Sequence, residues 1–267
     1  MERINQEFLF TSAVIRRPCK QLINGLTTQD IDKPDFDVAI LQHSDYAKTL
    51  IESGIKNLIE LDAREDYPDS VFVEDTAVAL PNYLLITQLG AISRRGEFTE
   101  DIREAFGKFY SQENIIEMTG NEYLDGGDVM RAGNTYFIGL STRTNQEGAD
   151  KLIKILQEKE GLNGIALNLP EGLHLKTIVT YLDENLLVGI KTIENIPEFD
   201  KYEKIIVEED ERHGANILNI NGNIVVPGSC PKLHKVLQDR GYTIKPVICD
   251  EFRKIDGSLT CMSVLIQ

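Results

Sequence analysis

The last stretch of the chain places a cysteine at the start of a short apolar segment. Cys261 follows the turn-forming pair Asp256-Gly257, and residues 262–266 after it have the composition of a buried strand. We therefore expect Cys261 to lie at the start of a strand, where its side chain would be held rigidly at the edge of a core. On its own such a cysteine is usually a small buried hydrophobe, and it becomes a candidate nucleophile only with suitable partners.

Three other segments carry polar side chains where an apolar strand is expected. Glu74 and Asp75 interrupt the apolar residues 71–80, Asp125 opens an Asp-Gly-Gly-Asp sequence, and His174 precedes another apolar run. A cysteine nucleophile needs a nearby proton carrier, and His174 has the chemistry to act as general acid and then as general base. Each feature also has an ordinary structural interpretation. Glu74 and Asp75 could be solvated acids, the Asp-Gly-Gly-Asp sequence could form only a tight turn, and His174 could be a hydrogen-bonded structural histidine.

Two arginines indicate how a ligand would be oriented. Arg94 and Arg143 each follow a predicted return strand, a place where arginine is usually exposed. A guanidinium binds a carboxylate through two parallel hydrogen bonds. Acids and arginines in one site would suit a ligand with a cationic end and a carboxylate end, such as an arginine-like molecule. The acids would raise the pKa of Cys261 in the empty site, and a cationic ligand would offset that effect.

The composition narrows the classes of partner. The chain has 267 residues and a formal net charge of −15, which argues against nucleic acid or an anionic membrane surface as partner. No apolar segment reaches the roughly 20 residues that a membrane span needs. Residues 1–7 carry acids where a signal peptide needs cations. We expect a cytoplasmic protein whose four cysteines are free thiols, with no metal-ligand spacing among them.

The predicted elements repeat along the chain. Strand, turn, strand, helix and strand recur in units that start near residues 74, 126, 174, 215 and 261, at intervals of 52, 48, 41 and 46 residues. A period of roughly 20–50 residues is typical of propellers and repeat arrays. The last unit is complete only if the N-terminal strand joins it, so we predict one domain, residues 1–267, closed into a ring by both termini. Equivalent positions of the units would then converge on one axis.

The individual elements follow from hydrophobic periodicity and turn residues. Residues 19–36 are predicted to form a long loop, which in a compact domain is usually a lid or binding element. Helices are predicted at residues 38–53, 99–109, 146–157 and 231–238. Strands are predicted at residues 9–15, 57–61, 69–80, 83–87, 114–118, 124–130, 136–139, 175–181, 186–190, 216–220, 223–226 and 262–266.

Six short motifs resemble, in order, those of the dimethylarginine dimethylaminohydrolase family. They lie at residues 68–75, 93–97, 125–128, 142–145, 173–176 and 254–261. The likeness runs from about residue 15 to the end of the chain, and the loop at residues 22–27 looks like that of the short bacterial members. The resemblance implies the pentein fold, an α/β propeller of five ββαβ blades with pseudo-fivefold symmetry.

The resemblance also implies a reaction. Nω-methylated L-arginine would be hydrolysed to L-citrulline and a methylamine, with a small molecule as the substrate and without a cofactor or metal. Cys261 would attack the guanidinium carbon to give a covalent thiouronium. His174 would protonate the departing amine and then activate water, and Asp125 would orient His174. Whether the protein forms a homodimer is left open.

Seven further residues would bind the substrate by the same resemblance. Asp75 would hold the guanidinium, with Glu74 supporting the acidic cluster. Arg94 and Arg143 would bind the α-carboxylate. The α-amine and the pocket walls would involve the remaining three, Asp69 and the backbone of Leu26 and Ile255.

Two other functions stay open. A related pentein hydrolase, a deiminase or ureidohydrolase acting on arginine or citrulline, would use the same Cys-His pair. A non-catalytic propeller would bind amino acids or protein partners without chemistry. The Leu-Lys pair after His174 is the dimethylarginine-type pattern, and Met262 follows the nucleophile as in bacterial members, where animal forms carry a second cysteine.

Overall fold

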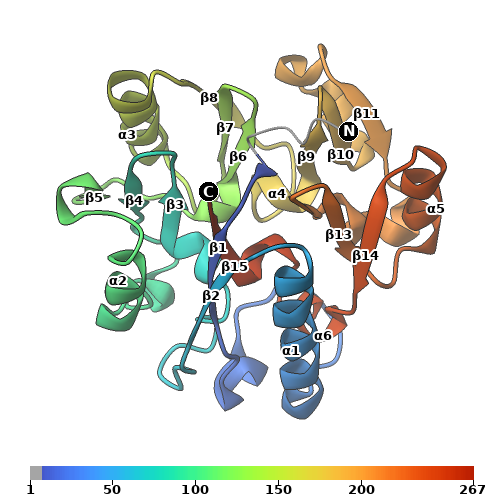
Figure 1. Cartoon of the computed structure of the whole chain (residues 1–267), viewed down its shortest axis with the longest axis horizontal. Helices are drawn as coiled ribbons and strands as arrows, with labels where there is room; N and C mark the ends of the chain where they lie inside the picture. The colour runs from blue at the N-terminus through green and yellow to red at the C-terminus, as the bar shows by residue number, and fades with distance from the viewer. Residues whose placement is uncertain (1–7) are drawn as a thin grey trace.

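Five three-stranded sheets surround one axis in the computed structural model, which describes residues 8–267 (Figure 1). Each sheet pairs its central strand antiparallel with one neighbour and parallel with the other. The predicted five-bladed α/β propeller is therefore confirmed. Blade by blade, the strands are β3 (Ala77–Ala79), β4 (Leu84–Ile86) and β5 (Ile115–Glu117); β6 (Val129–Ala132), β7 (Thr135–Leu140) and β8 (Asn163–Asn168); β9 (Val179–Asp183), β10 (Leu186–Gly189) and β11 (Glu203–Ile206); β12 (Leu218–Ile220), β13 (Asn223–Pro227) and β14 (Thr243–Val247); and β15 (Ser263–Ile266), β1 (Ser12–Arg16) and β2 (Asn57–Leu61).

The fifth blade joins the two ends of the described chain, as predicted. Strand β1 runs antiparallel to β15, with Ser12 opposite Ile266, and parallel to β2. The strand begins at Ser12 rather than at residue 9, because the backbone N–H of Phe10 bonds the side chain of Asn221 instead of a neighbouring strand. Because the two strands are antiparallel and Ile15 lies opposite Ser263, Cys261 is brought close to the C-terminal end of β1.

The longer helices lie outside the sheets, at the periphery of the ring (Figure 1). They are α1 (Phe36–Glu52), α2 (Glu100–Phe106), α3 (Gln146–Ile155) and α5 (Pro231–Asp239), and two short helices are α4 (Leu175–Ile178) and α6 (Asp250–Arg253). Helix α1 begins two residues before the predicted start, because the side chain of Asp35 accepts hydrogen bonds from two N–H groups of its first turn. In the β9–β11 blade the expected helix is replaced by two 3₁₀ turns, η8 (Lys191–Asn195) and η9 (Pro197–Phe199).

The hydrophobic core lies between the blades rather than on the axis. Central strands are covered on both faces, and each has a fully buried aliphatic side chain near its middle: Val14, Leu85, Ile138, Val188 and Val225. Strands covered on both faces read as continuous apolar runs, which is why the sequence located them well. Since the sheets supply the core, the axis is left to polar side chains.

Near the axis, four predictions of extended structure are wrong. Residues 69–80 and residues 124–130 do not each form one strand, Leu175 does not begin a strand, and Cys261 does not lie at a strand start. Each lies in or before a short helical turn that leads into the strand, and these turns are η3 (Val73–Thr76), η6 (Gly126–Asp128), α4 and η11 (Thr260–Met262). In the β12–β14 blade the corresponding segment is η10 (Glu209–Ala215), which is interrupted at Glu211.

Local hydrogen bonds explain these turns. The N–H of Asp128 bonds the carbonyl of Asp125, and the N–H of Thr177 bonds the carbonyl of His174. At these positions the backbone has no partner in a neighbouring sheet, so a turn satisfies the groups that a ladder would otherwise pair. A short apolar run alone does not distinguish a strand from such a turn.

The turns pack so closely that Gly126 has no room for a side chain. A Cβ atom at this position would lie 2.0 Å from the carbonyl oxygen of Glu74. We expect Gly126→Ala to lower the free energy of unfolding by about 3 kcal/mol, because backbone must move to admit the methyl group. Urea denaturation measures this change. Gly107→Ala is the control, since its Cβ would meet nothing closer than 3.3 Å, and equal stability of the two variants would contradict the packing argument.

The described residues bear on two expectations about location. Within residues 8–267, none of the helices has both the length and the apolar character that crossing a bilayer requires. The signal-peptide argument rested on residues 1–7, which lie outside the described residues.

Candidate active site

A small cavity brings most of the predicted site residues together. Its volume is about 20 Å³, which is room for about one water molecule. Larger hollows of about 210 and 330 Å³ contain neither Cys261 nor His174. Eight of the ten predicted residues line the small cavity: Leu26, Asp69, Asp75, Arg94, Arg143, His174, Ile255 and Cys261.

The candidate nucleophile is held by contacts from other blades. Cys261 is 6% exposed and lies in the turn η11. Its neighbour Thr260 is fixed through backbone and side chain by Asn216, and the Thr260 hydroxyl donates to Glu74 at 2.9 Å. Burial and then the charges of Glu74 and Asp75 raise the pKa of Cys261 well above its ordinary value. The side chain is therefore a thiol at neutral pH in the empty site.

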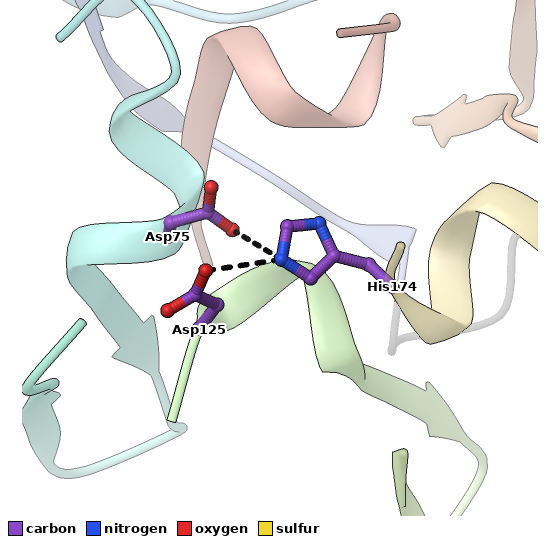
Figure 2. Close-up of side chains that lie close together, drawn as sticks. All are labelled: Asp75, Asp125 and His174. Atoms are coloured by element: carbon purple, nitrogen blue, oxygen red, sulfur yellow. Dashed lines mark hydrogen bonds and ion pairs between the residues drawn. The ribbon is translucent and has the colours of Figure 1, made fainter. Parts of the chain in front are cut away.

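The candidate proton carrier lies between two carboxylates. Nε2 of His174 is 3.0 Å from Oδ2 of Asp125 and 4.0 Å from Oδ1 of Asp75 (Figure 2). Asp125 is itself fixed, because its other oxygen accepts the N–H of Gly90. Burial alone would lower the pKa of His174, but the nearby carboxylates outweigh it and raise the pKa to about 9. His174 is therefore an imidazolium at neutral pH, ready to donate a proton.

Asp75 is the ionised acid of the cavity. It accepts hydrogen bonds from Arg94 at 2.7 Å and from the N–H of Gly127 at 2.9 Å. Burial would raise the pKa of Asp75, but the charges of His174 and Arg94 lower it to about 2. Arg94 also bonds Glu97 twice and the carbonyl of Phe72, so four of its five N–H groups are engaged within the protein. One N–H remains for the carboxylate role expected of Arg94.

Arg143 differs from Arg94 because its charge is only partly matched. Its Nη1 atom is buried and has no hydrogen-bond partner among the described residues. The nearest carboxylate oxygen, Oδ2 of Asp125, is 3.8 Å away. Leaving a buried charged donor without a partner is costly, and such groups call for an explanation. Arg143 lines the cavity, so an anionic ligand group there would satisfy it.

The predicted lid, residues 19–36, reaches the cavity at Leu26, and its first part is not a loop but the 3₁₀ turn η2 (Lys20–Asn24). Leu26 donates its backbone N–H to Oδ1 of Asp69 at 2.9 Å. Burial raises the pKa of Asp69. Ile255 lines the same end of the cavity and is buried.

Two predicted residues do not line the cavity. Asp125 stands behind His174, as the resemblance implied for an orienting acid. Glu74 points away and pairs with Lys176 at 2.6 Å, on the side of the 210 Å³ hollow. Its link to the site runs through Thr260 and through its charge.

Four lining residues were not assigned from the sequence: Phe72, Leu173, Asp256 and Gly257. Phe72 and Leu173 gave no signal, because an apolar residue beside an apolar run is usually core. Asp256-Gly257 was interpreted only as a turn. Gly257 is needed there, since a Cβ would lie 2.2 Å from the ring of Phe72.

Comparison with known proteins assigns the chain to a family. A family model described as "N,N dimethylarginine dimethylhydrolase, eukaryotic" matches residues 27–225. The chain belongs to the dimethylarginine dimethylaminohydrolase family. The member of this family from Pseudomonas aeruginosa is 38% identical over 257 residues, covering 96% of this chain and 99% of that protein.

Solved structures agree with membership of the dimethylarginine dimethylaminohydrolase family. A cysteine-to-serine mutant of the Pseudomonas aeruginosa enzyme, complexed with citrulline, matches with a TM-score of 0.93 and 36% identity over 97% of this chain and all of that one. The N-terminal domain of ArgZ, a cyanobacterial arginine dihydrolase, matches with a TM-score of 0.78 but 19% identity, over 96% of this chain and 98% of that one. The second likeness supports the pentein fold alone. The protein is a hydrolase of the dimethylarginine dimethylaminohydrolase family.

The raised pKa of His174 predicts that the stability of this protein depends on pH. Between pH 6.5 and about 9 the folded protein holds a proton on His174 that the unfolded chain has lost. The free energy of unfolding should therefore fall as pH rises through this window, by up to about 3 kcal/mol. The pKa of Asp75 is lowered to about 2, so its titration lies far below this pH window and does not affect stability there.

Urea denaturation at several pH values between 6 and 10 tests this prediction. Buried Glu97, whose pKa burial raises to about 7, also titrates there. The test therefore compares the free energy of unfolding of the wild type with that of His174→Gln. We expect the difference between the two values to become smaller as pH rises. A difference that is independent of pH would mean that His174 is not protonated in the folded state.

Proposed function

We propose that this hydrolase converts Nω-methylated L-arginines, namely asymmetric dimethylarginine and monomethylarginine, to L-citrulline and di- or monomethylamine. The proposal rests on the side chains that line the small cavity. Cys261, the imidazolium of His174 and the ionised Asp75 lie there with the unpartnered nitrogen of Arg143. A thiol, a proton donor, an anion and a cation together match a guanidino amino acid that is to be attacked at its guanidinium. The names of the relatives support the same substrate.

Binding would use the two ends of the cavity. The guanidinium pairs with Asp75, and the α-carboxylate meets Nη1 of Arg143 and the remaining N–H of Arg94. Asp69 and the backbone of Leu26 and Ile255 receive the α-amine. A cation placed near the thiol stabilises its anion, so substrate binding would lower the raised pKa of the nucleophile.

The reaction would proceed in two steps. In the first, the thiol of Cys261 loses its proton to solvent as the cationic substrate binds, and the thiolate forms a bond to the guanidinium carbon. The bond to the methylated nitrogen breaks, and that nitrogen takes a proton from His174. The amine leaves, and a covalent thiouronium remains. In the second, neutral His174 takes a proton from water and the oxygen bonds to the carbon. The carbon–sulfur bond then breaks, and the proton of the new hydroxyl goes to the departing sulfur, which releases citrulline and restores the thiol. Asp125 keeps the imidazole in place throughout.

A panel of substrates tests the proposal. Purified protein is incubated separately with asymmetric dimethylarginine, monomethylarginine, arginine and citrulline, while citrulline, methylamines and ammonia are measured. We expect citrulline and methylamine from the methylated substrates, with a kcat/KM well above that for arginine. Ammonia release from arginine or citrulline at a higher kcat/KM would favour a deiminase or ureidohydrolase. Binding without any product would favour a non-catalytic propeller.

A further inference from the structure

The lid is closed over the candidate active site in this structure. A cavity of about 20 Å³ holds about one water molecule and no amino acid. The lid must therefore open for a substrate to enter and for a product to leave. Both ends of the lid are anchored away from the cavity: Glu65 accepts the N–H groups of Lys20 and Gln21, and Glu251 accepts the N–H of Asp35.

The tip of the lid is held differently, by a carboxylate beside the cavity. Asp256 accepts three hydrogen bonds from two consecutive lid residues. The N–H of Thr28 donates to Oδ2 at 2.6 Å, while the Thr28 hydroxyl and the Gln29 amide donate to Oδ1 at 3.0 and 2.7 Å. The other carboxylate at the tip is Asp69, which the proposed function also assigns to the substrate amine. Asp256 is thus the carboxylate at the tip that serves the lid alone.

The backbone of Asp256 is shaped for this contact. Its φ of 59° is in the left-handed region, which is uncommon for residues other than glycine and is best tolerated by Asn and Asp. Both neighbours are confined, because Ile255 is buried and Gly257 lies against the ring of Phe72. A strained residue in a fixed turn, with its side chain engaged by a lid, is a pattern that indicates a functional constraint.

The same contact separates two spaces. Asp256, Gly257 and Leu173 line both the closed cavity and the hollow of about 330 Å³, and Thr28 and Gln29 line the hollow as well. The bridge from Asp256 to the lid tip therefore forms the partition between them. Breaking it would join the hollow to the cavity without disturbing either anchored end of the lid.

We propose that Asp256 is a positioning residue that latches the lid, and that the adjoining hollow is the vestibule through which substrate and product pass when the latch is released. The inference rests on the proposed function for the identity of the substrate. Asp256 contacts the lid rather than the reacting atoms, so it affects the fraction of molecules in which the lid is closed. Weakening the latch raises the open fraction, and with it the access of any solute to Cys261.

Asp256→Asn tests the latch with little change in shape. Asn has the same size and tolerates the left-handed backbone, but its NH₂ group must replace one of the two acceptor oxygens. The control is Asp239→Asn, which makes the same change at an exposed ion pair with Lys235 on α5. Thr28→Val is the second variant, because it removes one of the three bonds from an exposed lid residue and leaves the turn intact.

Two measurements need no turnover. In the absence of substrate, we expect Asp256→Asn to increase hydrogen exchange of the amides at residues 26–29, and alkylation of Cys261 by iodoacetamide, by about tenfold or more, since bonds to a charged acceptor are the stronger kind. Thr28→Val should also increase hydrogen exchange and alkylation, but less than Asp256→Asn does. Asp239→Asn should match the wild type in both measurements. Unchanged exchange and alkylation in both lid variants would overturn the latch.

Kinetics separate the latch from the proposed function. With dimethylarginine, we expect Asp256→Asn to raise KM about tenfold and to change kcat less, because the closed complex is harder to form but is chemically the same. If the wild type hydrolyses no methylarginine, the proposed function fails while exchange and alkylation still decide the latch. If the wild type is active and both lid variants keep its KM and exchange rates, the latch fails alone.

Discussion

Cys261→Ser is expected to lower kcat for asymmetric dimethylarginine by at least about a thousandfold, because a serine hydroxyl without a general base is a far weaker nucleophile than a thiolate. The change replaces one atom in a buried turn whose neighbour Thr260 is held by Asn216 and Glu74, so the fold should persist. Citrulline formation under saturating substrate measures the effect. Rapid acid quenching followed by mass spectrometry should show a covalent adduct on the wild type and none on the variant.

The chain offers a matched control for this experiment. Cys230 is also buried, and its sulfur lies 3.2 Å from Nε2 of His213, so it forms a second Cys-His contact. Neither residue lines the cavity of Cys261. Cys230→Ser should therefore retain wild-type turnover. A Cys261→Ser protein that keeps more than about a tenth of the wild-type kcat would be incompatible with a cysteine nucleophile.

His174→Gln is expected to lower kcat for dimethylarginine by about a hundredfold to ten-thousandfold, the range that a positioned proton donor contributes. Glutamine keeps a donor toward Asp125 but supplies no proton to an amine. His234→Gln is the control, because His234 bonds the carbonyl of Pro227 on another blade and does not line the cavity. The initial rates of the wild type, His174→Gln and His234→Gln are measured at saturating substrate from pH 6 to 10.

The leaving group distinguishes proton donation from mere positioning. S-methyl-L-thiocitrulline releases a thiol, which departs as a thiolate with little need of a proton, whereas dimethylamine cannot leave without one. A general acid at His174 therefore predicts a smaller loss with S-methyl-L-thiocitrulline than with dimethylarginine. Equal losses with the two substrates would show that His174 only shapes the site.

Regular periodicity made the peripheral elements predictable. Strand β2 was predicted at its observed bounds, and the helices at residues 36–52 and 231–239 were located within two residues at each end. In these elements local preference and tertiary packing agree, and caps such as Asp35 mark the ends. The ring followed from the repeat because five incomplete units bury their faces only against one another.

Near the axis the same methods failed, because the deciding interactions are not local. A turn and a strand at residues 73–76 have the same composition, and only the crowding of five segments selects the turn. The direction of Glu74, toward Lys176 and away from the cavity, also depends on that turn. The contact between Asp256 and the lid joins residues more than two hundred positions apart. The roles of individual residues came from the family resemblance, which carries information that composition lacks.

The pairing of β15 with β1 has a consequence for protein synthesis. On the ribosome, β1 emerges long before its antiparallel partner β15, so one edge of β1 stays uncovered while the other four blades are made. Exposed edges of this kind recruit other chains, and nascent polypeptides bearing them depend on chaperones. The same order of synthesis means that Cys261 can join His174 and Asp75 only after the other four blades have been made.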